Sequence, residues 1–353
     1  MDSSSNTKGK ILEERLYFFI EVVIVFFGLF CFLLIPLGIY SLITSENGIF
    51  LGPLFYFLKA IVLIAALPLM LYISNYLMEL QEDDKTEGKI INPSWSHIKL
   101  FSINRSNAKY QILYGFLLLF LLFIPLDCIT YILLPEMLGY QGEALTSNQS
   151  NVYLTESYGI FIISVIIIQF SVAFYEETLT RGFVTKRGAD HINKASAVII
   201  SSLYFGLMHF AYILNPISRS YSFWFPIIWF LQAFFVGMIL SLFIVKKKWV
   251  LPLIIAHAIN NIVSAHAVWN YLQGADFFFV FLSLYLPLLV ISILLLAWQF
   301  SRVKESVLNG LKELKKFFEK DDKNQQSTGD IYFRILIDLL LGLIIFGLGF
   351  LFV

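Results

Sequence analysis

The sequence predicts an all-α protein, a polytopic bundle of about nine transmembrane helices with a cytoplasmic N-terminus. Three observations predict this fold class. Of the 353 residues, 58% are hydrophobic and only 14% are charged, whereas a soluble domain is about half apolar and a quarter charged. The apolar residues form runs long enough for a bilayer, which needs about 20 residues per helix. Lys and Arg gather in alternate loops.

Nine apolar segments are predicted to span the membrane, separated by polar loops. Their ranges are 17–44, 50–78, 111–134, 157–175, 195–213, 223–245, 249–271, 275–299 and 331–353. The fourth segment can continue as a helix past residue 175, into the stretch LTRGFVTKR.

The positive charges predict the orientation. Of the 25 Lys and Arg residues, 22 lie in the N-terminal segment and the loops that alternate with it, and the opposite loops carry only Arg219. The other two, Lys59 and Arg334, fall near the ends of predicted spans, where long side chains can reach the membrane surface. This split predicts that the N-terminus is cytoplasmic and the C-terminus is outside.

We expect three regions: two N-terminal spans with a cytoplasmic loop (1–110), a core (111–271) and the C-terminal spans (272–353). Between the last two spans, residues 302–320 have a helical pattern with lysines opposite an apolar face. Such a helix either lies on the inner membrane surface or forms a solvated linker. The net charge is zero, so no global field indicates nucleic acid as a partner, and the expected environment is the lipid bilayer.

Polar groups at membrane depth are costly and by default indicate a functional site. The stretch FYEETLTRGF, residues 174–183, places Glu176 and Glu177 directly after an apolar run, with Arg181 four residues after Glu177. The fifth span contains His209, and the seventh contains His257 and Asn261. Residues four apart share a helix face, so Glu177 can pair with Arg181 and His257 with Asn261. Phe205 lies one turn before His209.

These groups are suited to hydrolysis by an activated water. A carboxylate in an apolar pocket is a better base near neutral pH, so Glu176 can take a proton from water. His209 can hold that water, and His257 with Asn261 can donate hydrogen bonds to an oxyanion. A Glu–Arg pair can also be a simple membrane anchor, and a lone His or Asn can join helices. The residues alone leave a proton-coupled transporter or a ligand-binding protein open beside an enzyme.

The site has to bring together residues at different expected depths. His209 lies 15 residues after Lys194, about 22 Å along a helix, whereas His257 lies nine residues after Lys248, about 13 Å. We therefore expect the stretch GADHINK, residues 188–194, to extend well outside the bilayer. His97 and His191 are interpreted as solvent-facing, Asn260 as a packing residue, and Gln232 is left unassigned.

Three ordered motifs make the chain resemble the CPBP group of intramembrane proteases. This group, also called the Abi family, contains CAAX-prenyl-processing endopeptidases and bacteriocin-processing enzymes. Its motifs are E-E-x-x-x-R, F-x-x-x-H and H-x-x-x-N or H-x-x-x-D. Here they read EETLTR at 176–181, FGLMH at 205–209 and HAINN at 257–261. The resemblance covers roughly residues 111–271, which would make that region the protease core.

The resemblance implies a role for each residue. Glu176 would activate the water, His209 would position it, and His257 with Asn261 would stabilise the oxyanion. The supporting residues would be Glu177, Arg181 and Phe205. Many members have an aromatic residue before the motif Arg, and this chain has Thr180 instead, followed by the usual Gly182.

Members of the family are described both as zinc enzymes and as metal-independent glutamate enzymes. If zinc were bound, Glu176, His209 and His257 would be its ligands, from three separate helices. The chain contains no H-E-x-x-H motif, and Asn261 suits an oxyanion better than zinc. We therefore favour a glutamate mechanism with no cofactor.

The sequence thus predicts a multi-pass intramembrane endopeptidase that cuts a membrane-associated peptide or protein at a cavity open to the cytoplasm. Its Ile-, Phe-, Lys- and Asn-rich composition suggests a bacterial cell membrane. The alternatives are a catalytically silent CPBP-type regulator or scaffold, which the extra spans would suit as docking surfaces, and the proton-coupled transporter. A transporter would use Glu176 and His209 as a proton relay.

Overall fold

The computed structural model describes residues 3–43, 50–79, 92–146, 149–210, 222–320 and 326–350. Within these ranges all regular structure is helical, and eight helices are long and apolar enough to cross a membrane. They are Thr7–Ile43, Leu51–Glu79, Ala108–Leu133, Tyr158–His191, Trp224–Lys247, Leu251–Leu272, Phe277–Lys315 and Thr328–Gly349. The predicted fold class is confirmed, while the orientation of the termini stays a prediction.

The expected fifth span is a shorter helix. It is α9 (Lys194–Phe210), which has 17 residues and is apolar but shorter than the eight candidates. The last three residues of the expected span, 211–213, lie outside the described residues. Helix α9 packs between α10 (Trp224–Lys247) and α14 (Thr328–Gly349), so its polar end is enclosed by protein.

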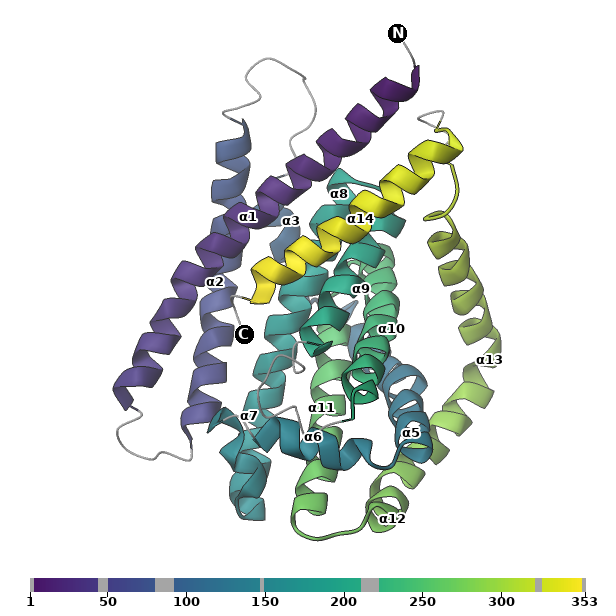
Figure 1. Cartoon of the computed structure of the whole chain (residues 1–353). Helices are drawn as coiled ribbons and strands as arrows, with labels where there is room; N and C mark the ends of the chain where they lie inside the picture. Colours follow the sequence, from purple (N-terminus) through teal and green to yellow (C-terminus); the bar gives the residue numbers. More distant parts are fainter. Residues whose placement is uncertain are drawn as a thin grey trace.

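Helices from the two ends of the chain pack together. In Figure 1, α1 (Ser3–Ile43) and α14 run obliquely side by side, and α2 (Leu51–Glu79) lies beside α1. A buried ion pair joins α1 to α14, with 3.0 Å between Nε of Arg15 and Oδ1 of Asp338. The hydroxyl of Ser196, on α9, donates a hydrogen bond to the other oxygen of Asp338. One buried carboxylate thus connects three helices.

The middle of the chain forms the remaining helices. A long helix comprises α4 (Ala108–Leu118), the π-helix η1 (Leu119–Phe123) and α5 (Ile124–Leu133). The short helices α3 (Pro93–Lys99), α6 (Met137–Thr146) and η2 (Gln149–Thr155) connect the spans. The helices α7 (Tyr158–Glu177), η3 (Thr178–Thr185, a π-helix) and α8 (Lys186–His191) are continuous and lead into α9. Helix α11 (Leu251–Leu272) follows α10.

The buried apolar residues form two clusters. One cluster fills the space among α4, α5, α7, α10 and α11, with Val280 of α12 (Phe277–Val280) and Tyr285 of η6 (Phe281–Tyr285). The other joins α1, α2 and α14 to η3, α8 and α9. Because Phe174 packs against both clusters, the two meet next to the glutamates. The N- and C-terminal spans therefore support the helix that carries the motif.

The segment 302–320 continues a membrane helix over most of its length. Helix α13 (Leu286–Lys315) includes residues 302–315 without a break, and the chain turns after Lys315. Arg334 of α14, expected to reach the membrane surface, is buried instead. Its guanidinium donates hydrogen bonds to the carbonyl oxygens of Phe317 and Glu319 at 2.8 and 2.9 Å. This contact fixes the end of the α13 segment to α14.

Candidate active site

The helix that carries the two glutamates does not end there. Glu176 lies inside the 34-residue helix Tyr158–His191, so the helix continues past residue 175 into LTRGFVTKR, as the sequence allowed. Glu176 lies 15 residues before the end of α8, and His209 lies 15 residues after the start of α9. In a helical hairpin, equal distances from the turn bring residues to the same level. The hairpin therefore explains how His209 can approach the glutamates.

The helix widens into a π-helix directly after Glu177. π-Helices leave backbone groups for side chains to satisfy and are frequent at functional sites. Here the carbonyl oxygen of Thr180 accepts hydrogen bonds from the hydroxyls of Thr185 at 3.1 Å and Ser201 at 3.0 Å. Gly182 admits a neighbour, because a Cβ at this position would lie 3.1 Å from Cε1 of His97.

His97 is therefore not solvent-facing, as the sequence suggested. It is only 4% exposed, and its Nδ1 lies 3.1 Å from the carbonyl oxygen of Gly182, which positions α3 on η3. Burial lowers the pKa of His97 to about 4, and the hydrogen bond to Gly182 acts in the opposite direction. His191 was also expected in solvent, but its Nε2 lies 2.6 Å from Oε2 of Glu21 on α1. Both histidines hold neighbouring helices on the motif helix.

Glu177 and Arg181 form the ion pair that their spacing suggested. Oε1 of Glu177 lies 3.1 Å from Nη1 of Arg181, and both side chains are completely buried. The guanidinium carbon of Arg181 lies 4.0 Å from the ring centroid of Phe205, a cation–π contact. Phe205 therefore contacts the motif arginine directly.

His257 lies between the two glutamates. Its Nδ1 is 2.8 Å from Oε1 of Glu177, and its Nε2 is 3.7 Å from Oε2 of Glu176. Because a carboxylate only accepts hydrogen bonds, Nδ1 carries the hydrogen and donates it to Glu177. Glu177 thus receives hydrogen bonds from both Arg181 and His257, while the side chain of Glu176 remains 32% exposed. The two adjacent acids are in different environments.

Aromatic rings fix the two imidazoles. The ring of Phe205 lies 4.8 Å from that of His209 and 6.0 Å from that of His257. Phe123 of η1 stacks on the other side of His257, with 18° between the planes. Nδ1 of His209 lies 2.9 Å from the carbonyl oxygen of Phe205, which leaves its Nε2 free to face the site. The two histidines therefore contact the same ring, that of Phe205, despite their different expected depths.

Asn261 lies one helical turn after His257 on α11 and is partly buried. The expected hydrogen bond between Asn261 and His257 is not found among the described residues, where Asn261 makes no side-chain hydrogen bond. Among the described residues, the side-chain amide of Asn261 is therefore available to donate a hydrogen bond to another acceptor.

The sequence left zinc open, with Glu176, His209 and His257 as its ligands. In the described ranges, no group of three His, Cys, Asp or Glu side chains is arranged to hold a metal ion. Nδ1 of His257 and Nδ1 of His209 are both engaged in hydrogen bonds, and the Nε2 atom of His257 lies 3.7 Å from Glu176. Metal-binding histidines commonly hydrogen-bond through their second ring nitrogen, so this arrangement does not decide between the glutamate and the zinc mechanism.

Another buried carboxylate, Asp127 on α5, was missed in the sequence. Its Oδ1 accepts a hydrogen bond from Gln232 at 2.8 Å, and its Oδ2 accepts one from Ser264 at 3.2 Å. This contact gives the unassigned Gln232 a partner, and Asn260 is buried as expected. A charged residue inside the run IPLDCIT was the signal that could have found Asp127.

Lys59 also differs from its expected place near a helix end. It is the ninth residue of α2, and its Nζ lies 4.3 Å from the ring centroid of Tyr175, next to Glu176. Helix α2 therefore contributes a cation close to the glutamates.

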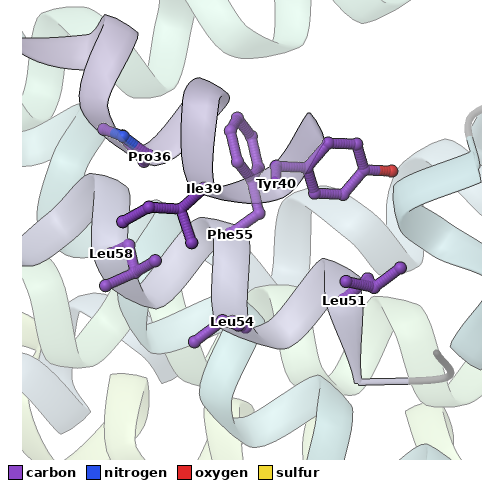
Figure 2. A pocket seen from close by; sticks show the side chains of 7 residues that line it. All are labelled: Pro36, Ile39, Tyr40, Leu51, Leu54, Phe55 and Leu58. Carbon is purple, nitrogen blue, oxygen red and sulfur yellow. The ribbon is translucent and has the colours of Figure 1, made fainter. Parts of the chain in front are cut away.

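An apolar hollow elsewhere between α1 and α2 is lined by Pro36, Ile39, Tyr40, Leu51, Leu54, Phe55 and Leu58 (Figure 2). None of the candidate site residues lines this hollow.

Fold and site together define a polytopic membrane protein with an acid–histidine centre among its helices. Residues 158–263 match the family model described as Rce1-like, the type II CAAX prenyl endopeptidases, and the chain therefore contains a domain of this family. The matched segment is less than a third of the chain and includes all seven candidate residues from Glu176 to Asn261. The match of this segment implies a protease with a protein substrate. No match was found among curated proteins or solved structures.

Proposed function

We propose that the protein is an intramembrane endopeptidase in which Glu176 activates a water molecule. The observation that carries this proposal is the arrangement of two adjacent glutamates around one imidazole. Glu177 is buried and engaged with Arg181 and His257, whereas Glu176 is partly exposed and faces the Nε2 edge of His257. One acid is therefore structural, and the other is free to exchange protons.

The reaction begins when the carboxylate of Glu176 takes a proton from water. The resulting hydroxide attacks the carbonyl carbon of the scissile peptide bond and forms a tetrahedral oxyanion. Glu176 then returns the proton to the leaving amine nitrogen as the C–N bond breaks. Positioned acid–base catalysis of this kind typically contributes about 10²–10⁴ in rate. His209, on the opposing helix of the hairpin, would hold the water with its free Nε2.

His257 and Asn261 would stabilise the oxyanion. Since Nδ1 of His257 donates to Glu177, Nε2 can donate to an oxyanion only when the ring carries a second proton. The amide of Asn261 would supply the second hydrogen bond, and each such donor typically contributes about 3–4 kcal/mol.

The substrate would be a membrane-associated peptide or protein, and the family description favours a prenylated protein with a C-terminal CAAX sequence. The composition favours a bacterial cell membrane as the location. We infer cleavage on the cytoplasmic side, because the predicted orientation puts the α8–α9 turn there.

The test compares membranes that contain the wild type, Glu176→Gln or His209→Ala at matched expression. Shortening of small membrane-associated peptides would be followed by intact-mass profiling, with an added farnesylated CAAX peptide as a defined probe. Asp127→Asn is the matched control, because it removes another intramembrane carboxylate outside the site. Products should be present in the wild type and the control and absent from the two site variants.

Three results would overturn the proposal. Equal products from the wild type and Glu176→Gln would remove the assigned base. Stoichiometric zinc in the purified protein, with activity lost to a chelator and restored by zinc, would replace the glutamate mechanism. pH-driven flux in liposomes without any cleaved product would instead support the transporter.

A further inference from the structure

Thr180 has contacts that no aromatic residue at this position could make. Its hydroxyl donates a hydrogen bond to the carbonyl oxygen of Glu176 at 2.5 Å and accepts one from Nη1 of Arg181 at 2.7 Å. The side chain is buried. The hydroxyl therefore links the motif arginine to the backbone of the candidate base. This is the position where the sequence departs from the family pattern that it resembles.

The contacts of Thr180 complete a closed loop of five residues. From the carbonyl of Glu176 the loop passes through Thr180 to Nη1 of Arg181. The same nitrogen donates to Oε1 of Glu177 at 3.1 Å, and that oxygen also accepts from Nδ1 of His257 at 2.8 Å. Nε2 of His257 then faces Oε2 of Glu176 at 3.7 Å. The loop thus begins at the backbone of Glu176 and ends at its side chain.

A loop of this kind restrains Glu176 at both ends. A serine or threonine hydroxyl that bonds the carbonyl four residues earlier often bends a helix locally, and Thr180 lies at the start of the π-helix. Hydrogen bonds that involve a charged group are about twice as strong as neutral ones, so Arg181 holds the hydroxyl firmly. The backbone of Glu176 and the imidazole that faces its carboxylate are then tied to one guanidinium.

We propose that Thr180 is a positioning residue for Glu176, acting through Arg181 and the carbonyl of Glu176. This proposal rests on the proposed function, in which Glu176 is the base. Loss of the hydroxyl would leave the water-activating carboxylate present but misplaced, so the chemical step would slow while substrate binding stayed the same. Misplacement of a reacting group by about 1 Å can cost about 10²-fold in rate.

Thr178 provides a matched control in the same helix. It lies two residues earlier in the π-helix and is also buried, but its hydroxyl has no hydrogen-bond partner among the described residues. Replacement of an unpaired buried hydroxyl by a methyl group of similar shape is neutral or stabilising. Thr180→Val and Thr178→Val therefore remove the same atom with opposite expected consequences.

The kinetic test measures kcat and KM of the purified full-length protein on a farnesylated CAAX peptide. For Thr180→Val we expect kcat to fall about ten- to hundredfold with KM unchanged. Thr180→Ser, which keeps the hydroxyl, should recover most of the rate, and Thr178→Val should match the wild type. Equal kcat values for Thr180→Val and wild type, or equal losses in both valine variants, would overturn the positioning role.

A second measurement needs no substrate. Thermal unfolding of the detergent-solubilised protein would be compared for Thr180→Val, Arg181→Lys and the double variant. If the hydroxyl bridges Arg181, the Tm losses should be clearly less than additive, whereas Thr178→Val with Arg181→Lys should be additive. Additive losses in the Thr180 cycle would overturn the loop. Full activity of Glu176→Gln would overturn the proposed function instead, so the two failures can be told apart.

Discussion

Replacement of either glutamate by glutamine should separate stability from activity. Glu177 and Arg181 are both completely buried, and Oε1 of Glu177 serves Arg181 and His257 at once. Glu177→Gln leaves the guanidinium without its counter-charge, and breaking a buried pair in this way typically costs about 3–5 kcal/mol. Glu176 is 32% exposed, and its ion-pair contact among the described residues is the 3.7 Å approach to His257. Glu176→Gln should therefore change stability by about 0.5 kcal/mol or less.

The assay is thermal unfolding of the two purified variants, read beside the rate of peptide cleavage. At roughly 2 °C of Tm per kcal/mol for a large domain, Glu177→Gln should lower Tm by roughly 6–10 °C. Glu176→Gln should keep the wild-type Tm and lose cleavage. The reasoning would be refuted if Glu177→Gln kept the wild-type Tm, or if Glu176→Gln were the less stable of the two.

Three further predictions concern the contacts that hold the site. The pKa of His97 is lowered to about 4, so the unfolded chain binds a proton at higher pH than the native state does. The stability that buried His97 provides above pH 6.5 should be lost, by up to ~3 kcal/mol, as pH falls toward 4. In the variant His97→Gln, the dependence of Tm on pH should therefore be flatter than in the wild type. An unchanged slope would contradict this prediction. Gly182→Ala places a methyl group against His97 and should lower the free energy of unfolding by about 1–3 kcal/mol. The variant should have a lower Tm, and a wild-type Tm would contradict the close approach of His97 to Gly182. Asp338→Asn uncouples α1 from α14 by removing the charge beside Arg15 and should lower the free energy of unfolding by about 3–5 kcal/mol. Proteolysis of the detergent-solubilised variant should be faster than that of the wild type. Wild-type resistance to proteolysis would contradict the role of Asp338 in joining α1 to α14.

The sequence could predict the features that depend on short spacing. Long apolar runs predicted nine spans, of which eight are long enough in the structure and one is the shorter helix α9. The four-residue interval between Glu177 and Arg181 predicted their contact because the geometry of a helix turn is fixed. The same reasoning placed Phe205 next to His209, and their rings do meet. These contacts lie within single helices, so no knowledge of the tertiary packing was needed.

Contacts between distant helices could not be read in this way. Nothing local to His97 indicates that Gly182, 85 residues later, offers its carbonyl and the space of a missing side chain. Lys59 was expected to reach the membrane surface because it falls near the end of a predicted span. Its actual orientation depends on which face of α2 packs against α7, and the sequence does not show this face. The helix through Glu176 continues because Thr185 and Ser201 satisfy a carbonyl of the π-helix, and this compensation has no sequence signature.

The contacts of the two acids agree with the proposed roles, structural for Glu177 and catalytic for Glu176. Arg181, Thr180 and His257 fix the geometry through Glu177, which leaves Glu176 as the acid with room for a water molecule. Helices from outside the matched segment support this arrangement, since α1, α2 and α14 pack against η3 and α9. We therefore expect the extra spans to be necessary for a stable site.

The measurement that tests the account most directly is the kcat of purified Glu176→Gln relative to wild type on a peptide that the wild type cleaves. Both proteins should first show the same Tm, so that folding is excluded as a cause. The account predicts a loss of about 10²–10⁴-fold, the usual contribution of a general base. A kcat within a fewfold of the wild type, at equal Tm, would contradict the central claim that Glu176 activates the water.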